Sequence, residues 1–334
     1  MTGYDQNPEA GQQDREIIDS SAMSPVDRDG NPIPVTIPIE MAPGVKAIYT
    51  TRLGGVSEGG FADCNLGGKG GEDPERTLRN RMALSRTVGG ALSIVRQVHS
   101  AVVADMDEAY ERNAPFGCVL SGSGDAPALE ADSQIISRPG VALGVFAADC
   151  LPVLFADTCS GMIAAAHCGR KGLQRGVIEA TVAAMVAKGA SPVSIVATLG
   201  PCICGDCYEV GGAIADDFDA QFPGTYTLTR FSGPGVDIAA AALQCLGRAG
   251  IPRDNIIDSR RRVTAATQYL SEDEELVDLC RRDDEGAPQL AERLAVLRHP
   301  LCTFENPLWY SHRRAVQSNK AEEGRLLALV IRER

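Results

Sequence analysis

Three residues that can bind a metal stand at or near the ends of buried, apolar segments. His99 lies in RQVHSAVV, Cys150 ends the run FAADC, and His167 ends the run MIAAAH. One thiolate and two imidazoles form a good ligand set for zinc, and a catalytic zinc uses three protein ligands and keeps a fourth position open. The same residues also suit a Cys–His nucleophile pair, or a packed core in which cysteine acts as a small hydrophobe.

A second cluster of cysteines occupies the turn-rich stretch GPCICGDCYEV, residues 200–210. Cys202, Cys204 and Cys207 resemble half of a structural zinc site. A closed structural site needs four ligands, and no fourth ligand lies nearby in the sequence. We therefore expect three buried or partly exposed thiols here, and no second metal.

A third set of residues is basic. Arg52 precedes the glycine-rich stretch LGGVSEGG, and Arg313 lies in SHRR. Arg170 and Lys171 come just before an expected helix, whose N-terminal N–H groups favour anions. The alternative is that these side chains are simply solvated. The glycine-rich stretch is not a phosphate-binding P-loop, because GxxxxGK[ST] does not occur.

The composition limits the classes of function. The chain has 334 residues with 44% hydrophobic content, which is enough for a large core. Its formal net charge of -12 argues against nucleic-acid partners. No apolar run approaches the ~20 residues that span a bilayer, and the N-terminus lacks the segments of a signal peptide. We expect a cytoplasmic protein without a membrane partner, whose eleven cysteines are mostly reduced.

The elements that would position these residues alternate between strands and helices. Residues 1–40 are polar and without periodicity, so we predict a flexible N-terminal tail, followed by one domain over 41–334. Several strands are nearly continuous apolar runs, as in sheets that are covered on both faces. The predicted strands are 45–49, 93–104, 133–137, 141–147, 153–156, 162–166, 194–199 and 325–331. The predicted helices are 74–88, 173–188, 213–222 and 236–249.

Two further segments are expected to lie outside this core. The charged residues 272–295 suggest a surface insertion, and residues 105–129 suggest a long loop rich in Gly, Ser, Pro and Ala. Strands mixed with helices indicate a layered α+β or α/β fold.

Taken together, these motifs resemble one family in their order along the chain. The YfiH-like proteins are also known as multicopper polyphenol oxidoreductase (laccase-domain) proteins and as purine nucleoside phosphorylases. The matching pieces are TTRLGGVSEGGFADCNLG at 50–67, NRMAL at 80–84, RQVHSAVV at 96–103, ADSQIISRPGVALGVFAADCLPVLFAD at 131–157, AAAHCGRKGL at 164–173, GPCICGDCYEV at 200–210, SHRR at 311–314 and GRLLALVI at 324–331. Any single piece is weak, but the ordered combination is specific.

The resemblance implies a layered α/β/β/α sandwich with mixed sheets in a single domain. It implies a catalytic zinc bound by His99, Cys150 and His167. It also implies phosphorolysis of purine nucleosides such as adenosine, inosine and methylthioadenosine, with adenosine deamination as a further activity. For that reaction, Arg52, Lys171 and Arg313 are our candidates to bind phosphate.

Two alternatives stay open. A copper-dependent polyphenol oxidase is named in the family description, but multicopper sites need several histidine-rich clusters, and this chain has four histidines. A metal could also merely stabilise a non-enzymatic binding protein.

One departure from the family pattern lies at the expected site. The family carries HAGWRG where this chain has HCGRKG, so Arg170 replaces an indole and Lys171 replaces an arginine. A guanidinium stacks on a base less well than an indole, and Lys171 lacks the two-point contact that arginine makes with phosphate.

Overall fold

Two stacked β-sheets form the centre of the molecule in a computed structural model that describes residues 26–68, 70–109 and 129–334. The five-stranded sheet has the order β1 (Thr36–Ala42), β2 (Val45–Thr50), β13 (Leu326–Arg332), β6 (Val141–Ala147) and β3 (Ala91–Ile94). The six-stranded sheet has the order β12 (Ile256–Ile257), β9 (Ile195–Leu199), β7 (Leu151–Asp157), β8 (Ile163–Cys168), β5 (Ser133–Ile136) and β4 (Val103–Asp105). Both sheets are mixed: β3 is parallel to β6 and β4 is parallel to β5, whereas β13 and β6 are antiparallel.

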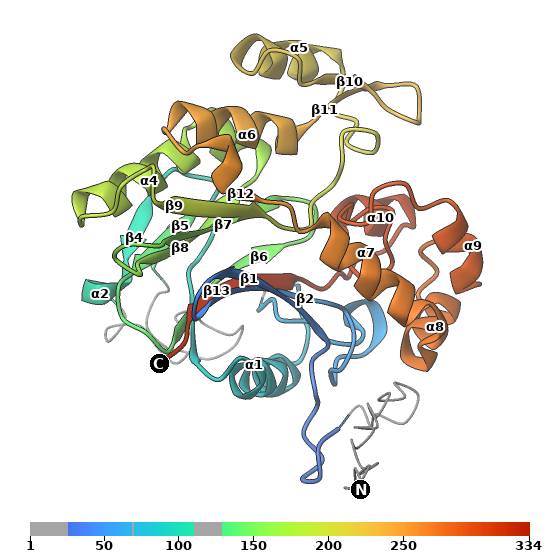
Figure 1. The fold of residues 1–334 in the computed structure, drawn as a ribbon. Helices are drawn as coiled ribbons and strands as arrows, with labels where there is room; N and C mark the ends of the chain where they lie inside the picture. Colours follow the sequence, from blue (N-terminus) through green and yellow to red (C-terminus); the bar gives the residue numbers. More distant parts are fainter. Residues whose placement is uncertain (1–25, 69, 110–128) are drawn as a thin grey trace, which may run out of the picture.

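Helices cover the outer face of each sheet (Figure 1). Helix α1 (Pro74–Val88) lies against the five-stranded sheet, and α4 (Val177–Ala187) and α6 (Ile238–Arg248) lie against the six-stranded sheet. The structure therefore confirms the α/β/β/α sandwich that the resemblance implied. The remaining elements are α2 (Met106–Ala109), α3 (Arg170–Gln174), α5 (Gly212–Gln221), the hairpin β10 (Tyr226–Leu228) and β11 (Pro234–Val236), α7 (Arg260–Tyr269), α8 (Glu274–Arg282), α9 (Leu290–Ala295) and α10 (His312–Gln317).

Burial on both faces explains why the central strands read as continuous apolar runs. In β6, Leu143 and Val145 belong to the core between the sheets, whereas Ala142 belongs to the core under α1. In β7, Leu154 faces the core between the sheets and Phe155 faces the helices α4 and α6. Because successive side chains of a strand point to opposite faces, both faces of each sheet must be apolar.

The domain begins earlier than residue 41. Strand β1 pairs with β2 from Thr36 onward, so the last residues assigned to the tail are part of the sheet. The alternation of buried Ile37, Ile39 and Met41 with exposed neighbours is the signal that marks this edge strand. Residues 1–25 lie outside the described residues.

Three other predicted elements differ from the structure. The strand expected over 93–104 is split into β3 and β4, which lie in different sheets. The helix expected over 173–188 is divided at Gly176 into α3 and α4, so Lys171 lies inside a short helix rather than before a long one. The charged segment 272–295 forms α8 and α9, which bury Leu276, Leu279 and Leu290 in the core.

The loop expected over 105–129 begins as the end of β4 and α2, and its residues 110–128 lie outside the described residues. No helix in the described part of the chain is long and apolar enough to cross a membrane.

Candidate active site

The candidate site forms where the chain passes from one sheet to the other. His99 lies in the crossing between β3 and β4, and Cys150 lies in the crossing between β6 and β7. His167 lies in β8, opposite Pro152 of β7. One potential ligand atom from each of the three residues lies within 4.8 Å of the others. The structure thus brings His99, Cys150 and His167 together, although His99 is on a connecting segment and not on a strand.

The geometry within this triad is close. Cys150 Sγ lies 3.8 Å from His99 Nε2. The imidazole rings of His99 and His167 lie edge to face, with their centroids 4.9 Å apart. Gly169 must lack a side chain, because a Cβ there would approach Cys150 Sγ to 2.8 Å and His99 Cδ2 to 3.1 Å.

Two residues at the crossings adopt the left-handed backbone region, which L-residues other than glycine rarely occupy. These are His99 with φ 59° and Asp149 with φ 93°. Such conformations cost on the order of 1–3 kcal/mol each and persist only where surrounding contacts hold them. The carboxylate of Asp149 supplies such contacts, because it accepts the Thr303 hydroxyl at 2.6 Å and the Arg313 backbone N–H at 2.7 Å.

Asp132 holds two members of the triad and was not singled out from the sequence. Its carboxylate bonds His167 Nδ1 at 2.9 Å and accepts the backbone N–H groups of His99 at 2.9 Å and Val98 at 3.2 Å. The Ser100 hydroxyl donates to it at 2.7 Å. Because Asp132 engages Nδ1 of His167, Nε2 is the nitrogen that remains for a metal or substrate. This carboxylate–histidine arrangement fixes the ring as in many metal sites.

These contacts shift the proton affinities of the triad. Burial alone would raise the pKa of the Cys150 thiol, but the neighbouring His167 and His99 outweigh it and lower the pKa to about 6. Burial alone would lower the pKa of His167, but Cys150 and Asp132 raise it to about 9. Burial works against ionisation of Asp132 as well, yet the hydrogen bonds from His167 and Ser100 hold its pKa well below the usual range. Cys150 and His167 therefore favour a thiolate paired with a protonated imidazole, and a metal bound by Cys150 and His167 would displace the proton of the imidazole.

The donor set fits a four-coordinate metal. Tetrahedral zinc with one sulfur and one nitrogen ligand separates those atoms by roughly 3.6 Å, close to the Cys150–His99 distance. Three protein ligands leave one position for a water or a substrate atom.

A cavity of about 250 Å³ opens beside the triad. It is lined by Val98, His99, Cys150, Arg170, Lys171, Arg175 and Tyr208. Three of its lining residues are cations, although the whole chain is acidic. Arg175 donates to the His99 carbonyl and Arg170 donates to Gln174 at 2.9 Å, whereas Lys171 is exposed and makes no salt bridge within the described residues.

The three predicted phosphate ligands have different places. Lys171 lines the cavity. Arg313 is not among the lining residues, but its guanidinium lies over the ring of Tyr208, which does line the cavity, 5.6 Å from the ring centroid. Arg52 is elsewhere: it is 1% exposed and pairs with Asp283 and Glu285 at 3.3 and 3.1 Å. The prediction for Arg52 is therefore wrong, because its charge is already neutralised inside the fold.

The chain is similar in sequence to known proteins along most of their length. The chain is 39% identical to a purine nucleoside phosphorylase of Streptomyces coelicolor over 206 residues, which cover 61% of this chain and 80% of that protein. It is 36% identical to a purine nucleoside phosphorylase of Corynebacterium glutamicum, over 72% of this chain and 91% of that protein. An adenosine deaminase from an unknown prokaryotic organism is 32% identical over 65% of this chain and 83% of its own length.

Solved structures show the same fold. The Neisseria meningitidis protein NMB0706 has a TM-score of 0.64 at 30% identity, over 90% of this chain and 99% of its own. The Bacillus licheniformis protein YfiH has a TM-score of 0.67 at 22% identity, over 92% of this chain and 99% of its own. The family model described as multi-copper polyphenol oxidoreductase laccase matches residues 46–275. The resemblance to YfiH-like proteins is thus confirmed, and the chain belongs to the multi-copper polyphenol oxidoreductase laccase family.

Proposed function

We propose that this protein is a zinc-dependent purine nucleoside phosphorylase that uses His99, Cys150 and His167 as zinc ligands. The observation that carries the proposal is one cavity that is lined by three cationic side chains and by His99 and Cys150 of the triad. Two relatives that are named purine nucleoside phosphorylases align with this chain over four fifths or more of their own length. The substrates would be a purine nucleoside, such as adenosine, inosine or methylthioadenosine, and inorganic phosphate.

The cationic wall would hold phosphate next to the sugar. Lys171 is the candidate for direct contact, because it lines the cavity and has no competing salt bridge in the described structure. Arg170 and Arg175 add positive charge, and an arginine can contact two phosphate oxygens at once. The replacement of the family's tryptophan by Arg170 therefore adds a cation to the wall that would face the phosphate.

In the reaction, a phosphate oxygen attacks C1′ of the ribose and the bond between C1′ and the purine nitrogen breaks. The products are ribose 1-phosphate and the free base, which takes up a proton. The basic residues would position the attacking anion, and Tyr208 would supply an aromatic surface beside the reacting groups. When bound, zinc would supply a Lewis acid to polarise a substrate atom or, in a deamination, to acidify water.

Deamination of adenosine is the second candidate activity. It is favoured by the three-ligand donor set, which leaves a coordination position free for water, and by the relative that is named an adenosine deaminase. Both activities would use the same triad, so they are compatible in one protein.

A multicopper oxidase fits less well. Of the four histidines in the chain, His299 pairs with Asp206 at 3.2 Å and His312 pairs with Glu323 at 2.9 Å. Only His99 and His167 are left for the triad, whereas several copper ions need several imidazole clusters.

The test is to incubate the purified protein with adenosine in the presence and absence of phosphate and to identify the products. Adenine with ribose 1-phosphate supports phosphorolysis, and inosine supports deamination. Adenine with free ribose indicates hydrolysis and contradicts the proposal. Failure to convert any nucleoside, in a protein with a full complement of metal, would favour a non-enzymatic binding role. None of the ten cysteines that the structure describes forms a disulfide, which suits a reaction in the reducing cytoplasm.

A further inference from the structure

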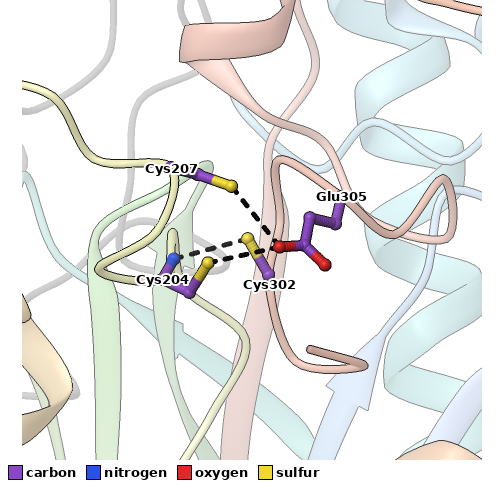
Figure 2. Close-up of side chains that lie close together, drawn as sticks. All are labelled: Cys204, Cys207, Cys302 and Glu305. Atoms are coloured by element: carbon purple, nitrogen blue, oxygen red, sulfur yellow. Dashed lines mark hydrogen bonds between the residues drawn. The ribbon is translucent and has the colours of Figure 1, made fainter. Parts of the chain in front are cut away.

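We propose a second, structural zinc site formed by Cys204, Cys207, Cys302 and Glu305. Figure 2 shows the three sulfur atoms and the Glu305 carboxylate pointing toward one another, from two segments far apart in the sequence. The sequence offered no fourth ligand near GPCICGDCYEV, and the structure supplies two ligands from around residue 303. Both lie beyond the range that the family model matches, and Cys202 is not part of the cluster.

The distances suit a tetrahedral metal. All four potential ligand atoms lie within 4.8 Å of one another. Cys204 Sγ and Cys207 Sγ each lie 3.5 Å from Glu305 Oε1. Ordinary zinc–sulfur and zinc–oxygen bond lengths place sulfur and oxygen ligands roughly 3.6 Å apart in a tetrahedral site. Small shifts of the side chains would therefore complete the coordination.

Two short turns present the ligands. Cys204 and Cys207 have the two-residue spacing of many zinc sites, and the N–H groups of Cys207 and Tyr208 donate to the Cys204 carbonyl at 3.0 and 2.9 Å. Cys302 and Glu305 repeat this spacing in the second turn. The backbone N–H of Cys204 also donates to Cys302 Sγ at 3.4 Å, which joins the two turns at the metal position.

Burial and charge around the cluster favour a bound cation. Cys207 and Cys302 are buried, and the Glu305 side chain is 2% exposed. Three thiolates and a carboxylate carry more negative charge than one Zn²⁺ neutralises, and Arg230 offsets part of the excess from 2.5 Å. The backbone N–H groups of Arg298 and His299 donate to the other oxygen of Glu305 at 2.7 and 3.0 Å. Such outer contacts orient a metal ligand.

The types of ligand and their location in the fold indicate a structural role for this site. Thiolate-rich sites select zinc over the harder divalent cations, and four protein ligands leave no open position for catalysis. Cys207 is followed by Tyr208 of the cavity wall, and Cys302 is followed by Thr303, whose hydroxyl holds Asp149 beside Cys150. The second zinc would thus fasten together two segments that shape the active site.

Metal content tests the proposal. Elemental analysis should find two zinc ions per wild-type chain, and one in Cys302→Ser and in Cys204→Ser. Cys202→Ser is the matched control, because Cys202 is a buried cysteine of the same segment as Cys204 but lies outside the cluster, and this variant should keep two ions. If Cys302→Ser retains as much zinc as Cys202→Ser, the proposal is overturned.

The zinc content of single variants distinguishes the triad from the second site. Cys150→Ala should lose one zinc ion and keep the one at the cluster, so total loss of zinc in this variant contradicts the second site. If the triad binds no zinc, the wild type holds one ion, Cys150→Ala keeps it and Cys302→Ser loses it. That result would weaken the proposed function and leave the second site intact.

A measurement on Cys150→Ala avoids any change in the cluster that could prevent folding. After its zinc is replaced by Co²⁺, three thiolates should give a strong sulfur-to-cobalt charge-transfer absorption in the near ultraviolet. Absence of this absorption would overturn the proposal. So would an intact mass, measured without reductant, that shows a disulfide within the cluster in the protein as isolated.

Discussion

Replacing Asp132 by Asn should weaken metal binding at the triad without changing any ligand. The Asp132 carboxylate bonds His167 Nδ1 at 2.9 Å and accepts the N–H of His99, so it orients two of the three ligands. An asparagine has one acceptor oxygen instead of two, and its amide NH₂ would face N–H groups. Loss of such an outer contact typically costs 10–100-fold in metal affinity, which corresponds to about 1.4–2.7 kcal/mol.

The assay is competition for zinc between the protein and a chelator of known affinity. Asp157→Asn is a matched control, because Asp157 is also buried and hydrogen-bonded to serine side chains, but lies at the opposite end of β7 from Cys150. Both variants should lose some stability, and only Asp132→Asn should lose zinc affinity. Equal affinities in the two variants would refute the role of Asp132 as the residue that orients His99 and His167.

Three further predictions concern Lys171, Arg52 and the carboxylate of Glu285, which pairs with Arg52. Lys171→Ala should raise the KM for phosphate about 10- to 150-fold, and more than the KM for nucleoside, because one charged hydrogen bond is lost. Steady-state kinetics with each substrate varied in turn measure both KM values, and an equal effect on both would contradict this role. Arg52→Ala should lower the free energy of unfolding by about 1.5–3 kcal/mol in denaturant titrations, because buried charged hydrogen bonds to Asp283 and Glu285 are lost while Arg293, Arg314 and Lys320 still pair with these carboxylates, and it should leave the KM for phosphate of the folded protein unchanged. Burial alone would raise the pKa of Glu285, but Arg52 and Arg314 lower it from 4.5 to about 2, so its stabilising effect is complete above pH 4.5 and is lost as the pH falls toward 2; Glu285→Gln should remove this part of the acid sensitivity in thermal unfolding.

The layered fold could be predicted because local patterns determine most of it. Continuous apolar runs mark β6, β7 and β8, and α1 extends over the predicted range 74–88. The split of 93–104 between two sheets could not be seen, because an apolar segment does not reveal the sheet in which each of its ends pairs. The short alternating β1 was missed because Pro38 and Glu40 make it look like a polar tail.

The sequence indicated the reactive residues of the candidate site, but not the residues that hold them in place. His99, Cys150 and His167 stand out by type, whereas Asp132 is one of many acidic residues and gains its meaning from contacts made by folding. Arg52 was misjudged because its partner Asp283 lies 231 residues further along the chain. A separation of 98 residues hid Cys302 and Glu305 in the same way, because they complete the cluster of Cys204 and Cys207 only in three dimensions.

The most direct test of the proposed function is the rate of purine release from inosine as the phosphate concentration is raised. The wild type should release hypoxanthine at a rate that increases with phosphate and saturates, with one ribose 1-phosphate formed per base. Cys150→Ala, which removes a triad residue that lines the cavity, should lose this activity. A wild-type rate that does not depend on phosphate, or a Cys150→Ala protein that retains the full rate, would contradict the assignment of this cavity to phosphorolysis.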